Sequence, residues 1–369
     1  MSNSDQEFAE ARKLHEEDRV RDAELAYRGI LKTDPEHTES LHMLGVAVAQ
    51  LGRVDEAIKL LSEASERDPG NSYCQSNLGE ALRQANKIDD AILAFRKAIE
   101  IDVTNFDANH SLAGLMAKRG QMADAVTLAR KATELRPSNA TAHVSFGEYL
   151  RRIDDSAGAM EATNRALEIV PNYGKALNLQ GLLLREQERY DEAIPLFEAG
   201  LRAKPSSKAN HLNLAASLTA AGRYEEAVKL FEDYFRLAPN DPHAYIGLGQ
   251  VHRLQEKFEA SERRLLEGLK LFPRLRALHY ELGLTLISVG RLDDADEHLA
   301  TAANGDSPAP TANIGYGKLL LQTGRLTEAA AQFEVALIRW PDNKAAKDGL
   351  AQAQGEVTIN VNWRDDDTA

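Results

Sequence analysis

The feature that most constrains the fold is a 34-residue period that runs through the whole chain. Taking the same position from each successive period gives alanine at nine sites and serine at the tenth. These positions are Ala23, Ala57, Ala91, Ala125, Ala159, Ala193, Ala227, Ser261, Ala295 and Ala329. A second phase, through Gly249, returns only glycine or alanine, and a third, through Pro239, returns mostly proline. Such self-similarity indicates one supersecondary unit repeated along an elongated array.

Each unit predicts two amphipathic helices separated by a short break. Residues 244–254 ("AYIGLGQVHRL") and 224–238 ("YEEAVKLFEDYFRLA") place apolar side chains at helical spacing. The recurring glycine or alanine of the first helix and the recurring alanine of the second remove side-chain bulk, so we expect the helices to pack closely. Proline ends the second helix because it cannot continue one, and Asp or Asn beside it is expected to cap the next helix.

These features resemble the tetratricopeptide repeat family. The resemblance is carried by residues 44–69 ("LGVAVAQLGRVDEAIKLLSEASERDP"), 78–102 ("LGEALRQANKIDDAILAFRKAIEID") and 316–341 ("YGKLLLQTGRLTEAAAQFEVALIRWP"). It covers residues 4–341 as ten units, which start at residues 4, 38, 72, 106, 140, 174, 208, 242, 276 and 310. It implies an all-α fold, an α-solenoid in which antiparallel helix pairs stack into a right-handed superhelix and the first helices line a concave groove. A further helix at 343–355 is expected to cap the array, because its ends must shed apolar surface.

Composition argues against several classes of function. The net charge of −13 opposes binding to nucleic acid or to an anionic membrane surface, because phosphate affinity depends on a surplus of Lys and Arg. No apolar run approaches the roughly 20 residues of a membrane-spanning helix, and the acidic N-terminus does not resemble a secretory signal. The single cysteine, Cys74, cannot form an internal disulfide. We therefore expect a cytoplasmic protein without nucleic-acid or membrane partners.

No pattern of residues predicts catalysis. Acidic pairs such as Glu225–Glu226 recur where second helices begin, and negative charge there favours the helix dipole. Adjacent residues of a helix point in different directions, so such a pair could not share a proton. "GLG" at 247–249 and "GYGK" at 315–318 complete no phosphate-binding loop, and the ten histidines lack metal-ligand spacing. We expect no catalytic residue, no cofactor and no metal site.

Residues that do not repeat are expected to carry specificity, and those on the predicted groove face are rich in basic side chains. Positions 2, 5, 9, 12 and 13 of each first helix share one face. In the middle units these positions supply the candidate binding residues Arg83, Lys118, Arg151, Arg152, Arg185 and Arg253. One interpretation is a groove for an acidic segment or a C-terminal carboxylate, held by charge-assisted hydrogen bonds. The other is that the arginines pair with Glu80, Glu148 and Glu186 nearby and do nothing else.

In the last units the same face turns apolar. Its candidate binding residues are Tyr280, Leu284, Ile287, Ile314 and Leu321, with Lys318 among them. An exposed apolar patch is typical of an interaction surface. Alternatively, the curl of the superhelix or the C-terminal helix buries it.

Two known groove patterns are not completed. The carboxylate clamp of chaperone-binding repeat proteins needs Lys and Asn at positions 5 and 9 of a first unit, where this chain has Phe8 and Arg12. The asparagine ladder of O-linked N-acetylglucosamine transferase repeats is matched here by Asn77 and Asn213 but is otherwise fragmentary. We therefore expect neither a chaperone-tail cochaperone nor a complete ladder.

The acidic C-terminal residues 356–369 break the repeat. Val357, Ile359, Val361 and Trp363 alternate with polar residues, which is a strand-like period. A lone strand is not stable. This tail is therefore expected either to dock on a partner or on a second copy of the chain, or to stay disordered.

Together these features predict a non-catalytic scaffold or adaptor that binds a peptide segment or a partner helix in the groove, with Arg151, Arg152 and Arg185 at its centre. The alternative is a substrate-recognition or targeting subunit of a separate enzyme such as a glycosyltransferase. A free-standing enzyme would need a nucleophile–base or metal constellation that the sequence does not offer. RNA binding would have to overcome the net charge of −13.

Overall fold

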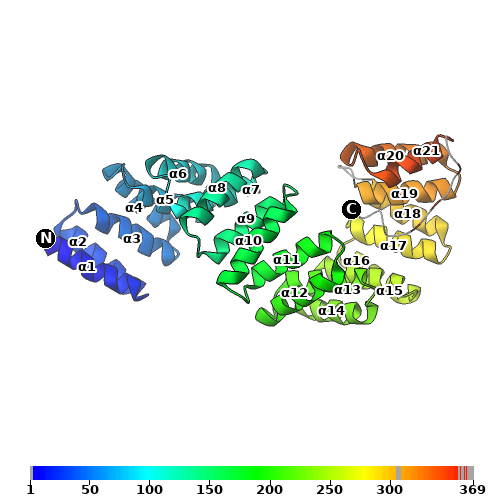
Figure 1. Ribbon diagram of the computed structural model, residues 1–369, viewed down its shortest axis with the longest axis horizontal. Coiled ribbons are helices and arrows are strands. Elements are labelled where there is room, and N and C mark those ends of the chain that lie inside the picture. Colours follow the sequence, from blue (N-terminus) through cyan, green and yellow to red (C-terminus); the bar gives the residue numbers. More distant parts are fainter. Residues whose placement is uncertain (1–2, 305–308, 356–357, 359–360, 362, 364–369) are drawn as a thin grey trace. The chain divides into compact units, whose positions relative to one another are not determined.

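The structure of the chain, a computed structural model, describes residues 3–304, 309–355, 358, 361 and 363. Within these residues it contains twenty-one α-helices and no strand, which confirms the expected all-α solenoid of helix pairs (Figure 1). The helices belong to two compact units, Met1–Leu183 and Leu184–Ala369. No helix in the described part of the chain combines the length and the apolar character needed to cross a lipid bilayer.

The helices alternate between first and second members of each predicted pair. The first unit contains α1 (Asn3–Glu16), α2 (Val20–Thr33), α3 (Thr38–Gln50), α4 (Val54–Arg67), α5 (Ser72–Gln84), α6 (Ile88–Ile101), α7 (Phe106–Lys118), α8 (Met122–Leu135), α9 (Ala140–Arg151) and α10 (Ser156–Ile169). The boundary between the units falls within α11 (Gly174–Glu186). The second unit contains α12 (Tyr190–Ala203), α13 (Lys208–Ala220), α14 (Tyr224–Leu237), α15 (Pro242–Leu254), α16 (Phe258–Leu271), α17 (Arg276–Ser288), α18 (Leu292–Ala303), α19 (Pro310–Gln322), α20 (Leu326–Arg339) and α21 (Lys344–Ala353).

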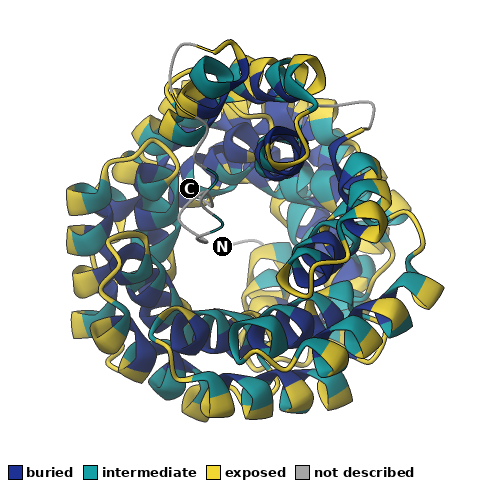
Figure 2. Cartoon of the chain, turned by 90° about the vertical axis from the view of Figure 1, so that its right-hand side faces the viewer, coloured by how far each residue is buried: buried dark blue, intermediate teal, exposed yellow. Residues whose placement is uncertain are grey.

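Within each unit the helices pack as hairpins, and each hairpin stacks on the next. An odd-numbered helix such as α3 lies against its own partner α4 and against the preceding α2, and it also contacts the neighbouring odd-numbered helices α1 and α5. Figure 2 shows buried residues where helices face one another and exposed residues in the connecting loops. We call the surface made by positions 2, 5, 9, 12 and 13 of the odd-numbered helices the first-helix face.

Close packing depends on the recurring glycines of the first helices. A Cβ atom on Gly249 would lie 2.5 Å from the Leu265 side chain, and one on Gly79 would lie 2.8 Å from the Phe95 ring. Equivalent pairs are Gly45–Leu61, Gly283–Leu299 and Gly317–Phe333. A larger residue would force the two helices apart. This packing offsets the roughly 1 kcal/mol that glycine costs inside a helix.

The recurring alanines of the second helices are fully buried, and so is Ser261, which replaces one of them. The Ser261 hydroxyl donates a hydrogen bond to the carbonyl oxygen of Gly249 at 2.8 Å, and its oxygen lies 2.9 Å from that of the Thr285 hydroxyl. A buried hydroxyl is costly unless it is hydrogen-bonded. These two contacts explain how a polar residue is accommodated at an alanine site.

The break between the two helices of each pair contains a residue in the left-handed backbone region. Positive φ angles occur once per repeat, at equivalent positions: Asp18, Gly52, Asn86, Gly120, Asp154, Glu188, Gly222, Glu256, Gly290 and Gly324. Glycine adopts this conformation at little cost, whereas a glutamate has a Cβ atom that crowds the backbone. The turn between the two helices therefore has the same backbone conformation in each repeat, and glycine adopts it with the least strain.

The acidic residues at the starts of second helices bind the arginine that precedes the helix. Arg223 donates two hydrogen bonds to Glu226, of 2.7 and 2.8 Å. The same contact recurs at Arg19–Asp22, Arg53–Glu56, Arg189–Glu192, Arg291–Asp294 and Arg325–Glu328. Asp155 instead caps α10 by accepting a hydrogen bond from the Gly158 amide at 2.9 Å. Helix starts therefore account for these carboxylates.

Candidate interaction surface

The candidate residues lie on several first helices of both units. In the first unit, Arg83 belongs to α5, Lys118 to α7 and Arg151 to α9, and Arg152 follows α9 directly as its C-cap. In the second unit, Arg185 belongs to α11, Arg253 to α15, Tyr280 and Leu284 to α17, and Ile314, Lys318 and Leu321 to α19. Each of them occupies position 5, 9, 12 or 13 of its repeat.

Three arginines of the first unit bind carboxylates of their own helix. Arg83 donates to Glu80 at 2.5 and 2.8 Å, and Arg151 and Arg152 both donate to Glu148 at 3.0 to 3.2 Å. Burial raises the pKa of Glu148, but the hydrogen bonds from the two arginines outweigh burial and hold that pKa below its ordinary value. These contacts match the alternative in which the arginines pair with Glu80 and Glu148.

Lys118 and Arg152 present their charge to solvent. Lys118 is exposed at the end of α7, and the Arg152 side chain is 45% exposed. They are one repeat period apart and so occupy the same position of their repeats, whose first helices α7 and α9 contact each other. Arg152 donates to Glu148 through Nε, and its terminal nitrogens make no hydrogen bond to another described residue. The two residues thus form a short basic row on the first-helix face.

In the second unit, Arg185 and Arg253 bridge successive repeats. The Arg185 guanidinium donates to the Asn213 side-chain oxygen at 3.2 Å, and the Arg253 guanidinium lies 3.5 Å from the Glu281 carboxylate. In each case the partner belongs to the first helix of the next repeat. These two arginines therefore tie one first helix to the next.

The apolar candidates differ in exposure. Tyr280, Leu284 and Lys318 are partly exposed, whereas Ile314 is 0% and Leu321 3% exposed. The Tyr280 ring lies over Gly315, where a Cβ atom would be 2.7 Å from its Cε2 atom. Ile314 and Leu321 therefore offer no surface to a partner in this conformation.

Two described residues of the C-terminal tail pack against the second unit. Val361 and Trp363 are partly buried against the hydrophobic cluster that contains Ile314 and Leu321. The indole Nε1 of Trp363 donates to the side-chain oxygen of Gln322, the last residue of α19, at 3.0 Å. The other two residues of the predicted strand-like pattern, Val357 and Ile359, lie outside the described residues.

The asparagines of the fragmentary ladder are engaged within the fold. The Asn77 side-chain nitrogen lies 2.8 Å from Nε2 of His42, and the Asn213 side chain accepts from Arg185. Burial lowers the pKa of His42, which favours the neutral ring that accepts this bond. Both amides thus contribute to contacts between neighbouring repeats.

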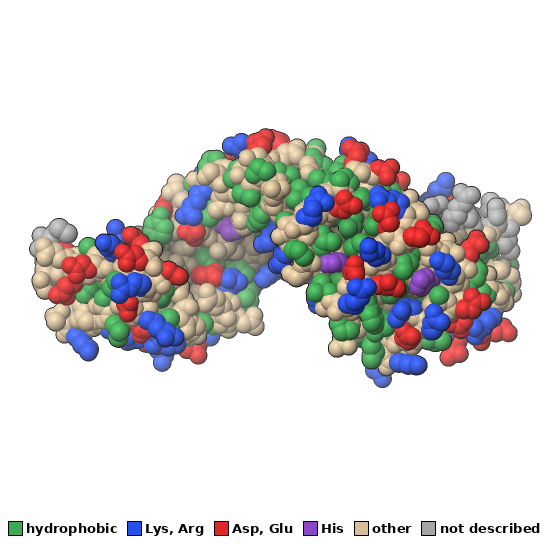
Figure 3. Space-filling view, turned by 90° about the horizontal axis from the view of Figure 1, so that it is seen from below, with side chains coloured by type: hydrophobic (Ala, Val, Ile, Leu, Met, Phe, Trp, Pro, Cys, Tyr) green, Lys and Arg blue, Asp and Glu red, His purple; other side chains and the backbone are tan. Residues whose placement is uncertain are grey.

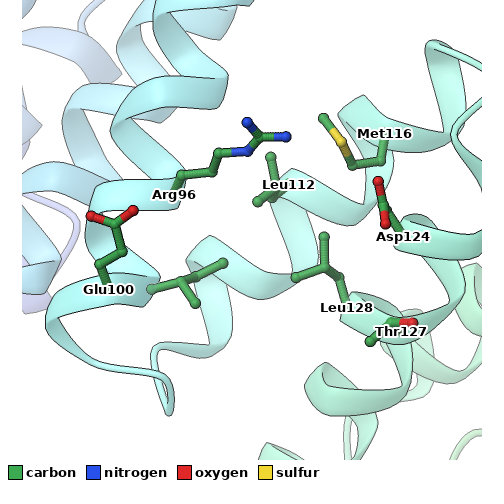
Figure 4. A pocket seen from close by; sticks show the side chains of 8 residues that line it. Arg96, Glu100, Leu112, Met116, Asp124, Thr127 and Leu128 are labelled. Carbon is green, nitrogen blue, oxygen red and sulfur yellow. The ribbon is translucent and has the colours of Figure 1, made fainter.

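Two cavities lie on the side of the second helices, where the sequence pattern predicts no binding residue. One, of about 390 Å³, lies between α6 and α8 above α7, where Arg96 extends over Leu112 toward Met116 (Figure 4). The other, of about 700 Å³, lies between α8 and α10, with the Arg130 guanidinium carbon 5.1 Å from the centroid of the Phe146 ring. The second cavity contains the repeat equivalent of every residue that lines the first. Both are therefore furrows produced by the repeat itself.

The fourth position of several first helices makes a contact that the repeat pattern does not predict. There a polar side chain bonds to the carbonyl oxygen six positions earlier, in the preceding loop. The pairs are Asn109–Val103, His143–Pro137, Tyr245–Pro239 and His279–Pro273, at 3.0 to 3.2 Å. Asn, His and Tyr can all make this hydrogen bond. A sequence search for the contact would therefore have to look for any side chain able to hydrogen-bond at the fourth position, not for one residue type.

Two further side chains of reactive type, those of Cys74 and His243, are not among the candidate binding residues. Cys74 is buried, and burial raises the pKa of its thiol to about 12. His243 is exposed and lies 2.8 Å from the Asp241 carboxylate. No group of three or more metal-ligating side chains occurs among the described residues. Acidic and basic side chains alternate over the face shown in Figure 3, with neither sign dominating it.

Comparisons with known proteins agree with this architecture. Family models described as tetratricopeptide repeat match residues 14–80, 184–245 and 218–282, residues 115–174 and 280–344, and residues 74–104. A comparison with curated proteins finds no match.

Several solved structures share the fold. Yeast Tom70 is similar with a TM-score of 0.56 and 15% identity, over 96% of this chain and 88% of that one. A tetratricopeptide repeat protein from Parabacteroides merdae is similar with a TM-score of 0.53 and 18% identity, over 68% of this chain and 98% of that one. At these identities the likeness shows the fold alone.

Proposed function

This chain belongs to the tetratricopeptide repeat family, whose repeats act as protein-interaction scaffolds, and we propose that it is an adaptor that binds an acidic segment of a partner protein along its first-helix face. It works by binding rather than by catalysis. We place it in the cytoplasm, because its single buried thiol, Cys74, fits a reducing compartment.

The observation that carries this proposal is the basic row of Lys118 and Arg152. Packed helices lie roughly 8–10 Å apart, and an extended peptide rises about 3.3 Å per residue. A peptide that crosses α7 and α9 would therefore place carboxylates about three residues apart opposite the two basic groups. Charge-assisted hydrogen bonds of this kind are stronger than neutral ones.

The other candidates have supporting positions in this proposal. Arg83 and Arg151 already bind Glu80 and Glu148, so a partner carboxylate would have to share them. Arg185 and Arg253 each contact the first helix of the next repeat. Their role in the proposal is to fix the spacing of these helices rather than to contact the partner. Tyr280, Leu284 and Lys318 are partly exposed and offer a second, more apolar contact area.

The test is selection of peptides from a random displayed library on the full chain, followed by titration of a labelled selected peptide. We expect selected sequences to carry acidic residues about three positions apart and to bind more weakly as salt rises. The double variant Lys118→Glu/Arg152→Glu should weaken binding at least tenfold.

The matched control is Lys59→Glu/Lys97→Glu, which makes the same change of charge at exposed positions on α4 and α6. It should leave the affinity within twofold of the unaltered chain. Selected peptides without acidic residues, or an equal loss in both double variants, would contradict the proposal.

A further inference from the structure

The apolar part of the first-helix face is buried more completely at α19 than at α15 and α17. Ile314 is 0% exposed, whereas Ile246, at the same position of α15, is partly exposed. Leu321 is 3% exposed, whereas Ile287, at the same position of α17, is partly exposed. Each of α15, α17 and α19 contacts a following odd-numbered helix, which for α19 is α21.

Two described residues of the C-terminal tail also pack on this part of the second unit. Val361 and Trp363 pack against the same cluster as Ile314 and Leu321, and Trp363 is fixed to Gln322 by a hydrogen bond of 3.0 Å. Gln322 is at position 13 of its unit, which belongs to the first-helix face. Trp363 thus makes a directional contact with this surface, beside the apolar packing of Val361 and Trp363 on the cluster. An aromatic ring with a bonded N–H group is a common anchor at protein interfaces.

We propose that the tail is a built-in ligand of the second unit, in which Val361 and Trp363 occupy the apolar first-helix face of α19 and compete there with an extended, apolar segment of a partner. This rests on the proposed function in that it assigns a regulatory element to the same kind of surface. The occupant of the surface in the free protein is the chain's own tail.

Tethering makes this competition effective. Trp363 is joined to the end of α21 by a short segment, so its local concentration at the surface is on the order of millimolar. A partner binds only the fraction of molecules in which the tail has left, and its apparent affinity falls by that fraction. Release of the tail would expose the apolar surface around Ile314 and Leu321.

Docking is tested in the full chain carrying Trp340→Phe, which leaves Trp363 as the sole tryptophan. We expect Trp363 to emit at a shorter wavelength and to be quenched less by acrylamide than the same residue in a synthetic peptide of residues 355–369. Adding Val361→Ser and Gln322→Ala should shift both readings toward those of the peptide. Thr358→Ser, a change at an exposed tail residue, is the matched control and should shift neither. Peptide-like emission and quenching in the starting chain would overturn the proposal.

Competition is tested by adding a labelled peptide of residues 355–369 to the full chain and to its Val361→Ser/Trp363→Ala variant. The variant should bind the peptide at least tenfold more tightly, because its own tail no longer holds the surface. Equal binding would overturn competition, and dimers of the unaltered chain that require Trp363 would show that the tail acts between copies instead. Binding of acidic peptides through Lys118 and Arg152 lies in the other unit and is read separately. Its loss would count against the proposed function and leave tail docking intact.

Discussion

The guanidinium of Arg253 on α15 lies 3.5 Å from the carboxylate of Glu281 on α17, and both side chains are only 10% exposed. Most other ion pairs described in the chain are far more open, such as Arg165–Glu168 on α10, at 53% and 63% exposure. Removing one partner of a buried pair leaves the other charge without compensation, whereas an exposed pair contributes little. The two pairs should therefore respond very differently to substitution.

We expect Arg253→Ala to lower the free energy of unfolding by about 3 kcal/mol, because Glu281 would keep its charge in a largely buried site. The apolar double variant Arg253→Met/Glu281→Leu should recover most of that loss. Urea unfolding of each variant measures the effect. Arg165→Ala is the control and should change stability by less than about 0.5 kcal/mol. If Arg165→Ala and Arg253→Ala lower the free energy of unfolding equally, burial does not determine how much an ion pair contributes to stability.

Glu188 and Glu256 should each be improved by glycine. Both have a φ of 59° at the turn between paired helices, where five equivalent positions are glycine. Because a left-handed conformation costs a residue with a Cβ atom about 1 kcal/mol, Glu188→Gly and Glu256→Gly should each raise the free energy of unfolding by roughly 0.5–1 kcal/mol. The reverse change, Gly222→Glu, should lower it by a similar amount. Thermal unfolding of the three single variants and of the double variant Glu188→Gly/Glu256→Gly measures these changes. A lower unfolding temperature in the Glu→Gly variants would contradict the prediction and show that another contact stabilises the glutamates.

The helix pairs could be predicted from the sequence because each repeated residue has a local packing cause. Gly249 recurs because Leu265 fills the space above it, and Ala227 recurs because its side chain is fully buried between packed helices. Equivalent causes act in every repeat, so the period is strong even where single residues vary. The turn position was less visible, since Glu188 and Glu256 depart from the glycine that its backbone favours.

The surface was harder to predict, because a helical pattern shows which residues share a face but not what lies against it. Ile314 and Ile246 occupy the same position of their units, yet Ile314 is fully buried in the presence of the tail residues. Arg253 was expected to face a partner, but the next repeat brings Glu281 to it. Such contacts depend on the distance between successive repeats. They also depend on segments outside the 34-residue repeat, such as the C-terminal tail.

The paired imidazoles of His279 and His298 should make stability sensitive to acid. Their Nδ1 atoms are 3.0 Å apart, and Nε2 of His279 lies 3.0 Å from the Pro273 carbonyl oxygen, which can only accept. Nε2 of His279 therefore carries the proton, and its Nδ1 accepts from Nδ1 of His298. This hydrogen bond joins α17 to α18.

The direction of the pH dependence follows from His298. Burial lowers its pKa in the folded chain, and His279 lowers it further against the opposing effect of Glu297 and Asp294. The unfolded chain, with an ordinary histidine pKa near 6.5, therefore takes up protons first as the pH falls. The stability from this pair is present above about pH 6.5 and is lost as the pH drops through the lower folded pKa.

We expect the unfolding temperature of the unaltered chain to fall between pH 7.5 and pH 5.5, and the fall to be smaller in His298→Gln. Burial also lowers the pKa of His42, His110 and His252, so some acid sensitivity should remain in this variant. His243→Gln is the control, because that imidazole is 66% exposed. Equal falls in the unaltered chain and in His298→Gln would show that the two facing imidazoles do not couple folding to pH.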